Sequence, residues 1–185
     1  MDIQILGNSS LKIKSKKTTL AVDPKTSISK FDADAVLVTD KESDTKRIDN
    51  FRVIINSVGE YEISGLKISG IKVGTNVMFG LTSENANALI TKASQLENIS
   101  TEKLGEYKIA IINADAKINQ SILTSLEPSV VVLYGENAKE EAKAMGKENA
   151  VVSSKISISE DKLPEEMDVM VLSWFLHLDK ILNLS

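Results

Sequence analysis

The sequence predicts an α/β fold (α+β in some schemes) in which one sheet packs on another and helices cover the outside. Two observations lead to this prediction. The first half of the chain alternates apolar and polar residues in short runs, which is typical of half-buried strands. The second half alternates apolar runs with helical patterns, which indicates parallel strands joined by helices.

The first half contains short strands separated by polar turns. An antiparallel meander is expected to end at Asp23-Pro24, since proline cannot continue a central ladder. The first turn, residues 7–10, could be a phosphate-holding nest, but its place between two strands favours a plain hairpin turn. The expected strands are 3–5, 11–13, 20–22, 35–38, 52–56, 66–71, and a hairpin of 76–81 with 86–91, with a short helix at 46–50.

The second half follows the order β-α-β-α-β. Residues 109–112 form a continuous apolar run, as expected for a strand covered on both faces. Asp115 is the expected N-cap of the next helix, and Gly146 is expected to end the one after it. The expected helices are 100–106, 118–126 and 137–145, and the expected strands are 109–112, 130–133, 151–152, 156–158 and 168–172.

Composition narrows the classes of protein that this chain can belong to. Its 185 residues fit one domain, which we assign to residues 1–173, followed by an apolar tail at residues 174–185. The formal net charge is −4 and no basic stripe is present, so we expect no nucleic-acid partner. Cysteine is absent, which excludes disulfides and thiolate metal sites. No apolar run reaches membrane-spanning length, so we expect a cytoplasmic protein without a membrane partner.

The chain has a single histidine, His177. Histidine is the commonest metal ligand and the usual general base near neutral pH. One histidine cannot build a multi-histidine zinc site, and His177 lies in the apolar tail, where a packing or surface position is expected.

The apolar residues of the tail recur at helical spacing, so a helix is expected there. A chain end this apolar either docks on its own domain or forms a subunit interface. We expect a homo-oligomer that associates through this tail, with docking on the chain's own domain as the alternative. The residues that carry the pattern are Trp174, Phe175, Leu178, Ile181 and Leu182.

A charged loop follows the expected strand at residues 35–38, at the kind of position where α/β proteins place ligand sites. Asp40, Glu42 and Asp44 could hold a hard divalent cation through oxygen ligands. Basic residues at positions 41, 46 and 47 balance their charge, so a solvated, salt-bridging loop is the favoured interpretation.

Several short motifs resemble, in order and spacing, the metallo-β-lactamase superfamily, and most closely its small lactonase-like branch of predicted Zn-dependent hydrolases. The resemblance extends from residue 1 to about residue 173 and implies an αββα sandwich with a metal site at one edge. The motifs are Gly7-Asn8-Ser9 in place of Gly-His-Ser, Asp23-Pro24, Val58-Gly59-Glu60-Tyr61-Glu62 with Gly65, and Leu163-Pro164-Glu165-Glu166 before the last strand.

The metal-binding motifs of that superfamily are missing. Its His-x-His-x-Asp-His segment corresponds to residues 40–45, where only Asp44 is kept. Its bridging aspartate falls near Lys92, and its last histidine falls near Gly135. The resemblance therefore implies a catalytically inactive protein that acts as a binding or scaffold module and needs no cofactor. The alternative is a divergent metal-dependent hydrolase, acting on a phosphoester or lactone, that holds Mg²⁺, Mn²⁺ or Zn²⁺ at its carboxylates.

Overall fold

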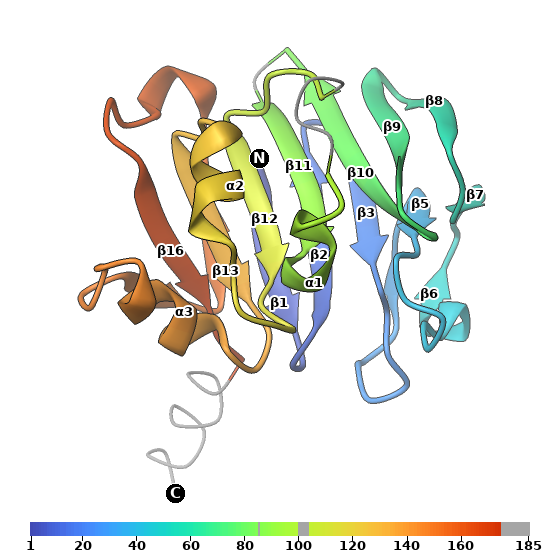
Figure 1. Cartoon of the computed structure of the whole chain (residues 1–185). Coiled ribbons are helices and arrows are strands. Elements are labelled where there is room, and N and C mark those ends of the chain that lie inside the picture. The colour runs from blue at the N-terminus through green and yellow to red at the C-terminus, as the bar shows by residue number, and fades with distance from the viewer. Residues whose placement is uncertain (85, 100–103, 175–185) are drawn as a thin grey trace, which may run out of the picture.

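The computed structural model describes residues 1–84, 86–99 and 104–174, and these residues form a sandwich of two large sheets (Figure 1). The smaller of the two has six strands in the order β15-β1-β2-β3-β5-β7. β1, β2 and β3 pair antiparallel, which confirms the predicted meander, whereas β5 adds parallel to β3. The strands are β15 (Lys155–Ser157), β1 (Asp2–Leu6), β2 (Ser10–Ser15), β3 (Thr18–Val22), β5 (Ala35–Leu37) and β7 (Val53–Ile55).

The larger sheet has eight strands in the order β14-β16-β13-β12-β11-β10-β9-β8. Its first-half strands pair antiparallel, and β10 with β11 is the predicted hairpin. From β11 onward the neighbouring strands are parallel, as the alternation of strands and helices predicts. The strands are β8 (Gly59–Ile63), β9 (Leu66–Val73), β10 (Asn76–Ser83), β11 (Ala86–Lys92), β12 (Ile109–Asn113), β13 (Val130–Tyr134), β14 (Val151–Ser153) and β16 (Asp168–Leu172).

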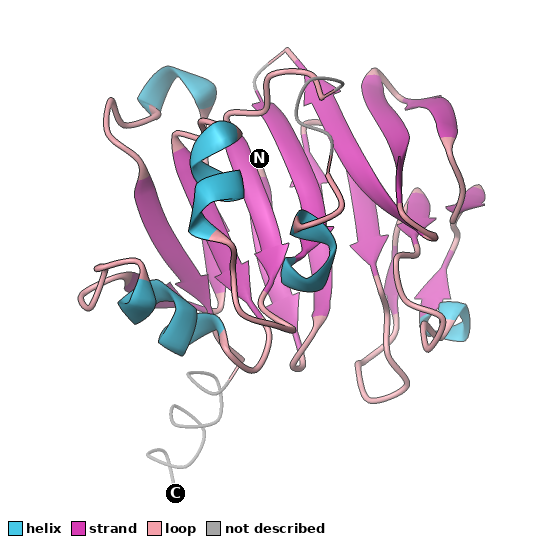
Figure 2. Cartoon of the chain, in the orientation of Figure 1, coloured by secondary structure: helices cyan, strands magenta, loops and turns pink. Residues whose placement is uncertain are grey.

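The two outer faces of the sandwich are covered differently. Helices α1 (Ala93–Leu96), α2 (Gln120–Ser125) and α3 (Ala138–Ala144) cover the eight-stranded sheet (Figure 2). The segment between β3 and β7, apart from β5 itself, covers the six-stranded sheet, where Ile28, Ala33 and Ile48 pack on it. That segment contains β4 (Phe31–Asp32) and β6 (Ile48–Asp49), which pair with each other, and the 3₁₀ turn η1 (Thr45–Arg47).

The apolar side chains of a strand point alternately into the core between the sheets and toward the helices outside. In β12, Ile109 and Ile111 point into the core between the sheets, whereas Ala110 and Ile112 pack against the helices. Because successive strand residues face opposite ways, a continuous apolar run fits a strand covered on both faces. The predicted α/β sandwich is therefore confirmed.

Three local predictions need correction or lie in part outside the described residues, and some short elements were not predicted. The expected helix at 46–50 is the shorter η1 followed by β6, and the sequence analysis missed the four-residue helix α1. The N-cap of α2 is Asn119, whose side chain accepts from two backbone N–H groups, and not Asp115. Of the expected helix at 100–106, residues 104–106 are not helical and the others lie outside the described residues. A short 3₁₀ turn, η3 (Glu160–Lys162), precedes β16.

The expected tail helix and His177 also lie outside the described residues, apart from Trp174 at its start. In the part of the chain that the structure describes, no helix is long and apolar enough to span a bilayer.

Candidate functional site

Asp23 organises the loop that follows β5. It comes directly after β3, has a backbone φ of 45° and is 2% exposed. Its Oδ1 accepts hydrogen bonds from the Thr39 N–H at 2.7 Å, the Asp40 N–H at 3.0 Å and the Ser43 hydroxyl at 3.1 Å. Its Oδ2 accepts from the Thr39 hydroxyl. A buried carboxylate needs such partners, so Asp23 is satisfied by the loop and in turn stabilises its conformation.

Hydrogen bonds join this loop to two further segments. The Asp44 N–H donates to the Pro24 carbonyl at 2.6 Å, and the Ser10 hydroxyl donates to the Asp23 carbonyl at 2.8 Å. The Lys25 N–H donates to the Ser10 hydroxyl at 3.1 Å. Hydrogen bonds thus join the β1–β2 turn, the segment after β3 and the loop after β5 into one edge of the sandwich.

Two lysine ammonium groups reach Asp40, the first of the predicted carboxylates. Lys25 Nζ lies 2.8 Å from Asp40 Oδ2, and Lys92 Nζ lies 3.6 Å from the same oxygen. Lys92 is the last residue of β11 in the other sheet, so this ion pair joins the two sheets at the edge. All three side chains are partly buried.

The three predicted carboxylates do not form one common site. Glu42 is largely exposed, with Oε2 3.6 Å from Lys25 Nζ. Asp44 instead caps η1 by accepting from the Lys46 N–H at 3.2 Å, and it lies 3.7 Å from Arg47 Nε. The structure therefore places Asp44 against η1 and the other two against Lys25.

These residues do not fit a metal ion. No group of three or more His, Cys, Asp or Glu side chains within residues 1–84, 86–99 and 104–174 is arranged to hold one. A hydrolytic zinc centre needs several neutral nitrogen or carboxylate donors around an open position. At this edge, by contrast, two cationic side chains already compensate the Asp40 charge, and a divalent cation placed there would be repelled by both.

The environment of Asp40 favours its ionised form. Partial burial raises the pKa of its carboxyl, but this effect is outweighed by hydrogen bonds from the Glu42 N–H and the Lys25 ammonium and by the charges of Lys92 and Lys25. Together they lower the pKa from the ordinary 3.8 to about 2. Asp40 therefore remains charged at neutral pH.

This lowered pKa predicts a pH-dependent contribution to stability. Because the folded-state pKa lies below the ordinary value, the contribution is present above pH 3.8 and is lost as the pH falls toward 2. We expect Lys92→Met to reduce the free energy of unfolding near neutral pH by about 1 kcal/mol or less, after allowance for solvent screening. The deficit should disappear near pH 2, and an NMR titration of Asp40 should show a raised pKa.

The control for this prediction is Lys41→Met, because Lys41 is exposed and makes no ion pair with a described residue. Its stability should follow that of the unmodified protein at every pH. A Lys92→Met deficit that persists unchanged to pH 2 would show that the lysine acts through packing and not through the charge of Asp40.

The ends of the parallel strands form the other side of the edge. Gly135 follows β13 with a φ of +96°, a conformation that favours glycine. A Cβ there would also lie 2.4 Å from Asn113 Oδ1, so the Asn113 side chain would have to move. The Asn137 amide donates to the Ala114 carbonyl at 3.1 Å, which joins the turns after β12 and β13. Burial raises the pKa of the Tyr134 hydroxyl well above its ordinary value, and the charges of Asp23 and Asp115 add to this effect.

Asp115, in the turn after β12, has a structural partner. Its carboxylate accepts from the Ser94 N–H at 3.0 Å and from the Ser94 hydroxyl at 2.7 Å. Asp115 therefore holds the beginning of α1 against the turn after β12.

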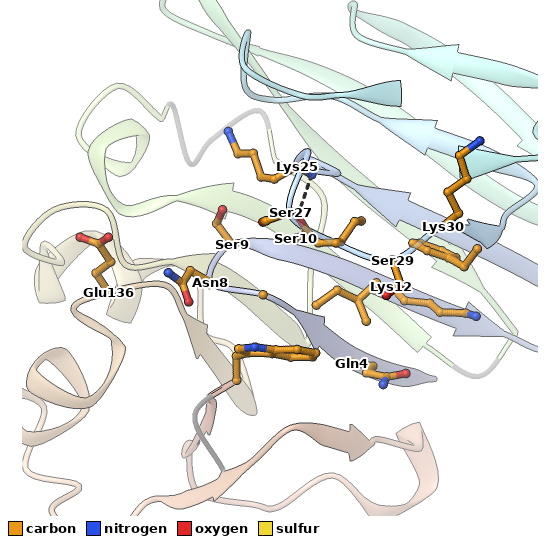
Figure 3. Close-up of a pocket in the computed structure, with 15 residues that line it drawn as sticks. Gln4, Asn8, Ser9, Ser10, Lys12, Lys25, Ser27, Ser29, Lys30 and Glu136 are labelled. Atoms are coloured by element: carbon orange, nitrogen blue, oxygen red, sulfur yellow. Dashed lines mark hydrogen bonds between the residues drawn. The ribbon is translucent and has the colours of Figure 1, made fainter. Parts of the chain in front are cut away.

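A cavity of about 670 Å³, here called the basic pocket, lies next to this edge on the side of the β1–β2 turn (Figure 3). Lys12 and Lys30 lie at one end of it, and Asn8 and Glu136 lie at the other (Figure 3). Trp174 also lines it, together with a neighbouring cavity of about 440 Å³ that shares Asn8 and Glu136. Cavities of this size can accept a small molecule.

Sequence reasoning located the edge but missed most of what occupies it. It placed Lys92 near the position of the superfamily's bridging aspartate, but it gave no role to Lys25 or to the basic pocket. The position of Lys12 on the outer face of the sheet could have been predicted from the sequence. Lys12 lies in β2 between Leu11 and Ile13, which are buried, and successive strand residues face opposite ways. The segment after Pro24, which carries Lys30, shows no sequence pattern from which its conformation could have been predicted.

Comparison with known families identifies the class to which this fold and edge belong. The sequence profile of a family described as "Beta-lactamase superfamily domain" matches residues 2–99. The chain therefore belongs to that family, which confirms the resemblance seen in the sequence motifs. No curated protein sequence matches the chain significantly.

Solved structures show the same fold over most of the chain. A protein from Thermotoga maritima, proposed to be a Zn-dependent hydrolase of the metallo-beta-lactamase superfamily, superposes with a TM-score of 0.72 at 18% identity, covering 93% of this chain and 98% of its own. The metallo-beta-lactamase fold protein YhfI from Bacillus subtilis gives 0.58 at 7% identity, covering 93% and 96%. Igni18, a metallo hydrolase from Ignicoccus hospitalis, gives 0.57 at 13% identity, covering 85% and 98%.

Proposed function

We propose that this chain is a cytoplasmic, non-hydrolytic member of its family that acts as a metal-independent binding module. The observation that supports this most directly is the pair of lysines on Asp40. In this proposal Lys25 and Lys92 supply the positive charge that a metal would otherwise supply at the edge. The sequence adds a second argument, because a chain with one histidine lacks the imidazoles of a two-zinc site.

The first test is the metal content of the protein purified without a chelator. We expect elemental analysis to find far less than one metal ion per chain. Addition of Zn²⁺ or Mn²⁺ should leave the melting temperature unchanged, whereas an ion at 100 times its dissociation constant would stabilise the fold by about 2.7 kcal/mol. Neither a phosphoester nor a lactone should be hydrolysed above the buffer rate.

If the analysis does find metal, two variants test whether the ion is bound at the predicted carboxylates. Asp44→Ala removes the carboxylate that stands at the one conserved position of the metal motif, and Glu166→Ala removes an exposed carboxylate in the loop before β16. One metal per chain that is lost in Asp44→Ala and kept in Glu166→Ala would overturn the proposal. The divergent hydrolase that uses Asp40, Glu42 and Asp44 would then take its place.

We also propose that the protein is a homo-oligomer associated through the tail at residues 174–185. The support is the spacing of apolar residues in the sequence, since a surface this apolar is seldom left in water. We expect light scattering to give a multiple of the chain mass for the full-length protein and the mass of one chain for the double variant Leu178→Asp with Leu182→Asp. Lys180→Gln, on the polar side of the pattern, should keep the multiple. A single-chain mass for the unmodified protein would contradict the proposal.

A further inference from the structure

The basic pocket carries an excess of positive charge in a chain whose net charge is negative. Three lysines line it, and Glu136 is the carboxylate among its lining residues. The whole chain has a formal net charge of −4, so this surface differs from the average in sign. Clefts lined by one sign of charge raise the local concentration of ligands of the opposite sign.

Lys12 differs from the other two lysines of the pocket in its partner. Lys25 lies against Asp40, and Lys30 Nζ lies 3.6 Å from Asp49 Oδ1. The ammonium group of Lys12 lies instead 4.8 Å from the centre of the Phe31 ring, and it forms no ion pair with any described carboxylate. Lys12 is partly buried, and a charge removed from water without a counterion is unfavourable. An anion beside Lys12 would offset that cost.

Neutral polar groups and an apolar wall complete the pocket. The hydroxyls of Ser9, Ser27 and Ser29 line it and can donate to an anion. The apolar wall is formed by Leu6, Ile28, Phe31 and Trp174. Trp174 also borders the neighbouring cavity, together with Asn8 and Glu136. Asn8 and Glu136 lie at the end opposite Lys12 and Lys30 (Figure 3).

We propose that the basic pocket binds a small organic anion that carries a phosphate or carboxylate on a flat apolar ring. The anionic group lies at Lys12, and the ring lies toward Trp174. This inference rests on the proposed binding function and adds to it the place and the chemical class of the ligand. It involves neither a metal ion nor a bond-breaking step.

Trp174 provides the measurement, because it is the single tryptophan of the chain. Phenyl phosphate is titrated into the full-length protein in the presence of a chelator, and the tryptophan emission is recorded. We expect a saturable change, with benzoate giving the same kind of change. Inorganic phosphate, which lacks the ring, should bind at least about tenfold more weakly. Equal affinity for phenyl phosphate and inorganic phosphate would overturn the assignment of the ring.

Substitutions of two lysines in β2 distinguish binding in the pocket from a nonspecific effect of positive charge. Lys12→Met should raise the dissociation constant for phenyl phosphate about tenfold or more, because a charge-assisted contact is lost. Lys12→Arg keeps the charge and should stay within about threefold. Lys14→Met, two residues along the same strand and outside the pocket lining, should change the constant less than about twofold. Circular dichroism verifies that each variant is folded.

The outcomes distinguish this inference from the proposed function. No saturable change in the unmodified protein, or equal constants for the Lys12→Met and Lys14→Met variants, would overturn the inference and leave the metal-independent function standing. Phenol released from phenyl phosphate on addition of Mn²⁺ or Zn²⁺ would overturn the non-hydrolytic function, while the Lys12 comparison would still decide where the anion binds.

Discussion

Replacement of Asp23 by alanine is expected to lower the free energy of unfolding by about 3 kcal/mol, because four donors lose their common acceptor. The backbone φ of 45° adds to the loss, since alanine is strained in this region. For a chain of this length the melting temperature should fall by about 6 to 12 °C. Urea unfolding followed by circular dichroism measures the change.

Asp23→Asn is the matched control. Asparagine tolerates a positive φ, keeps Oδ1 as an acceptor and places an amide next to the Thr39 hydroxyl, which can accept from it. We expect it to cost about 1 kcal/mol, well below the cost of alanine. Equal losses in the two variants would mean that the negative charge of Asp23, and not its role as an acceptor, holds the loop.

Gly70→Ala is expected to destabilise the protein by about 2 to 3 kcal/mol through overpacking. A Cβ at this position in β9 would lie 2.2 Å from the carbonyl oxygen of Ser57, a backbone atom that has little freedom to move. Gly70 pairs with Gly59 of β8, so relief of the clash would separate β8 from the sheet. Thermal and urea unfolding should both report the loss.

Gly105→Ala serves as the control, because a Cβ at Gly105 would meet no atom within 4 Å and its φ is ordinary. Its free energy of unfolding should change by about 0.5 kcal/mol or less. Because Gly→Ala also restricts the unfolded chain, which favours folding, any loss in Gly70→Ala must come from the folded state. A similar loss for the two variants would show that the contact with Ser57 does not set the cost.

The strands of the sandwich could be predicted from the sequence, because their apolar patterns are local. The short helices could not be predicted as well. Helix α1 is a single turn, and a segment that short has almost no helical preference of its own. The N-cap of α2 is Asn119 and not the predicted Asp115. Asp115 instead binds Ser94, a residue 21 positions earlier in the chain. A pattern of neighbouring residues does not contain such a contact.

In the candidate site, too, some features could be predicted from the sequence and others depend on contacts between distant residues. Sequence alone indicated that imidazole is scarce and that the edge carries Asp40, Glu42 and Asp44. It also determined the family, because the fold motifs depend on short segments that keep their order. The folded chain was needed to show that Asp44 faces η1, while Lys25 and Lys92 meet at Asp40. Lys92 reaches Asp40 from another sheet, and an ion pair between residues so far apart in the chain depends on how the sheets pack and not on any local pattern.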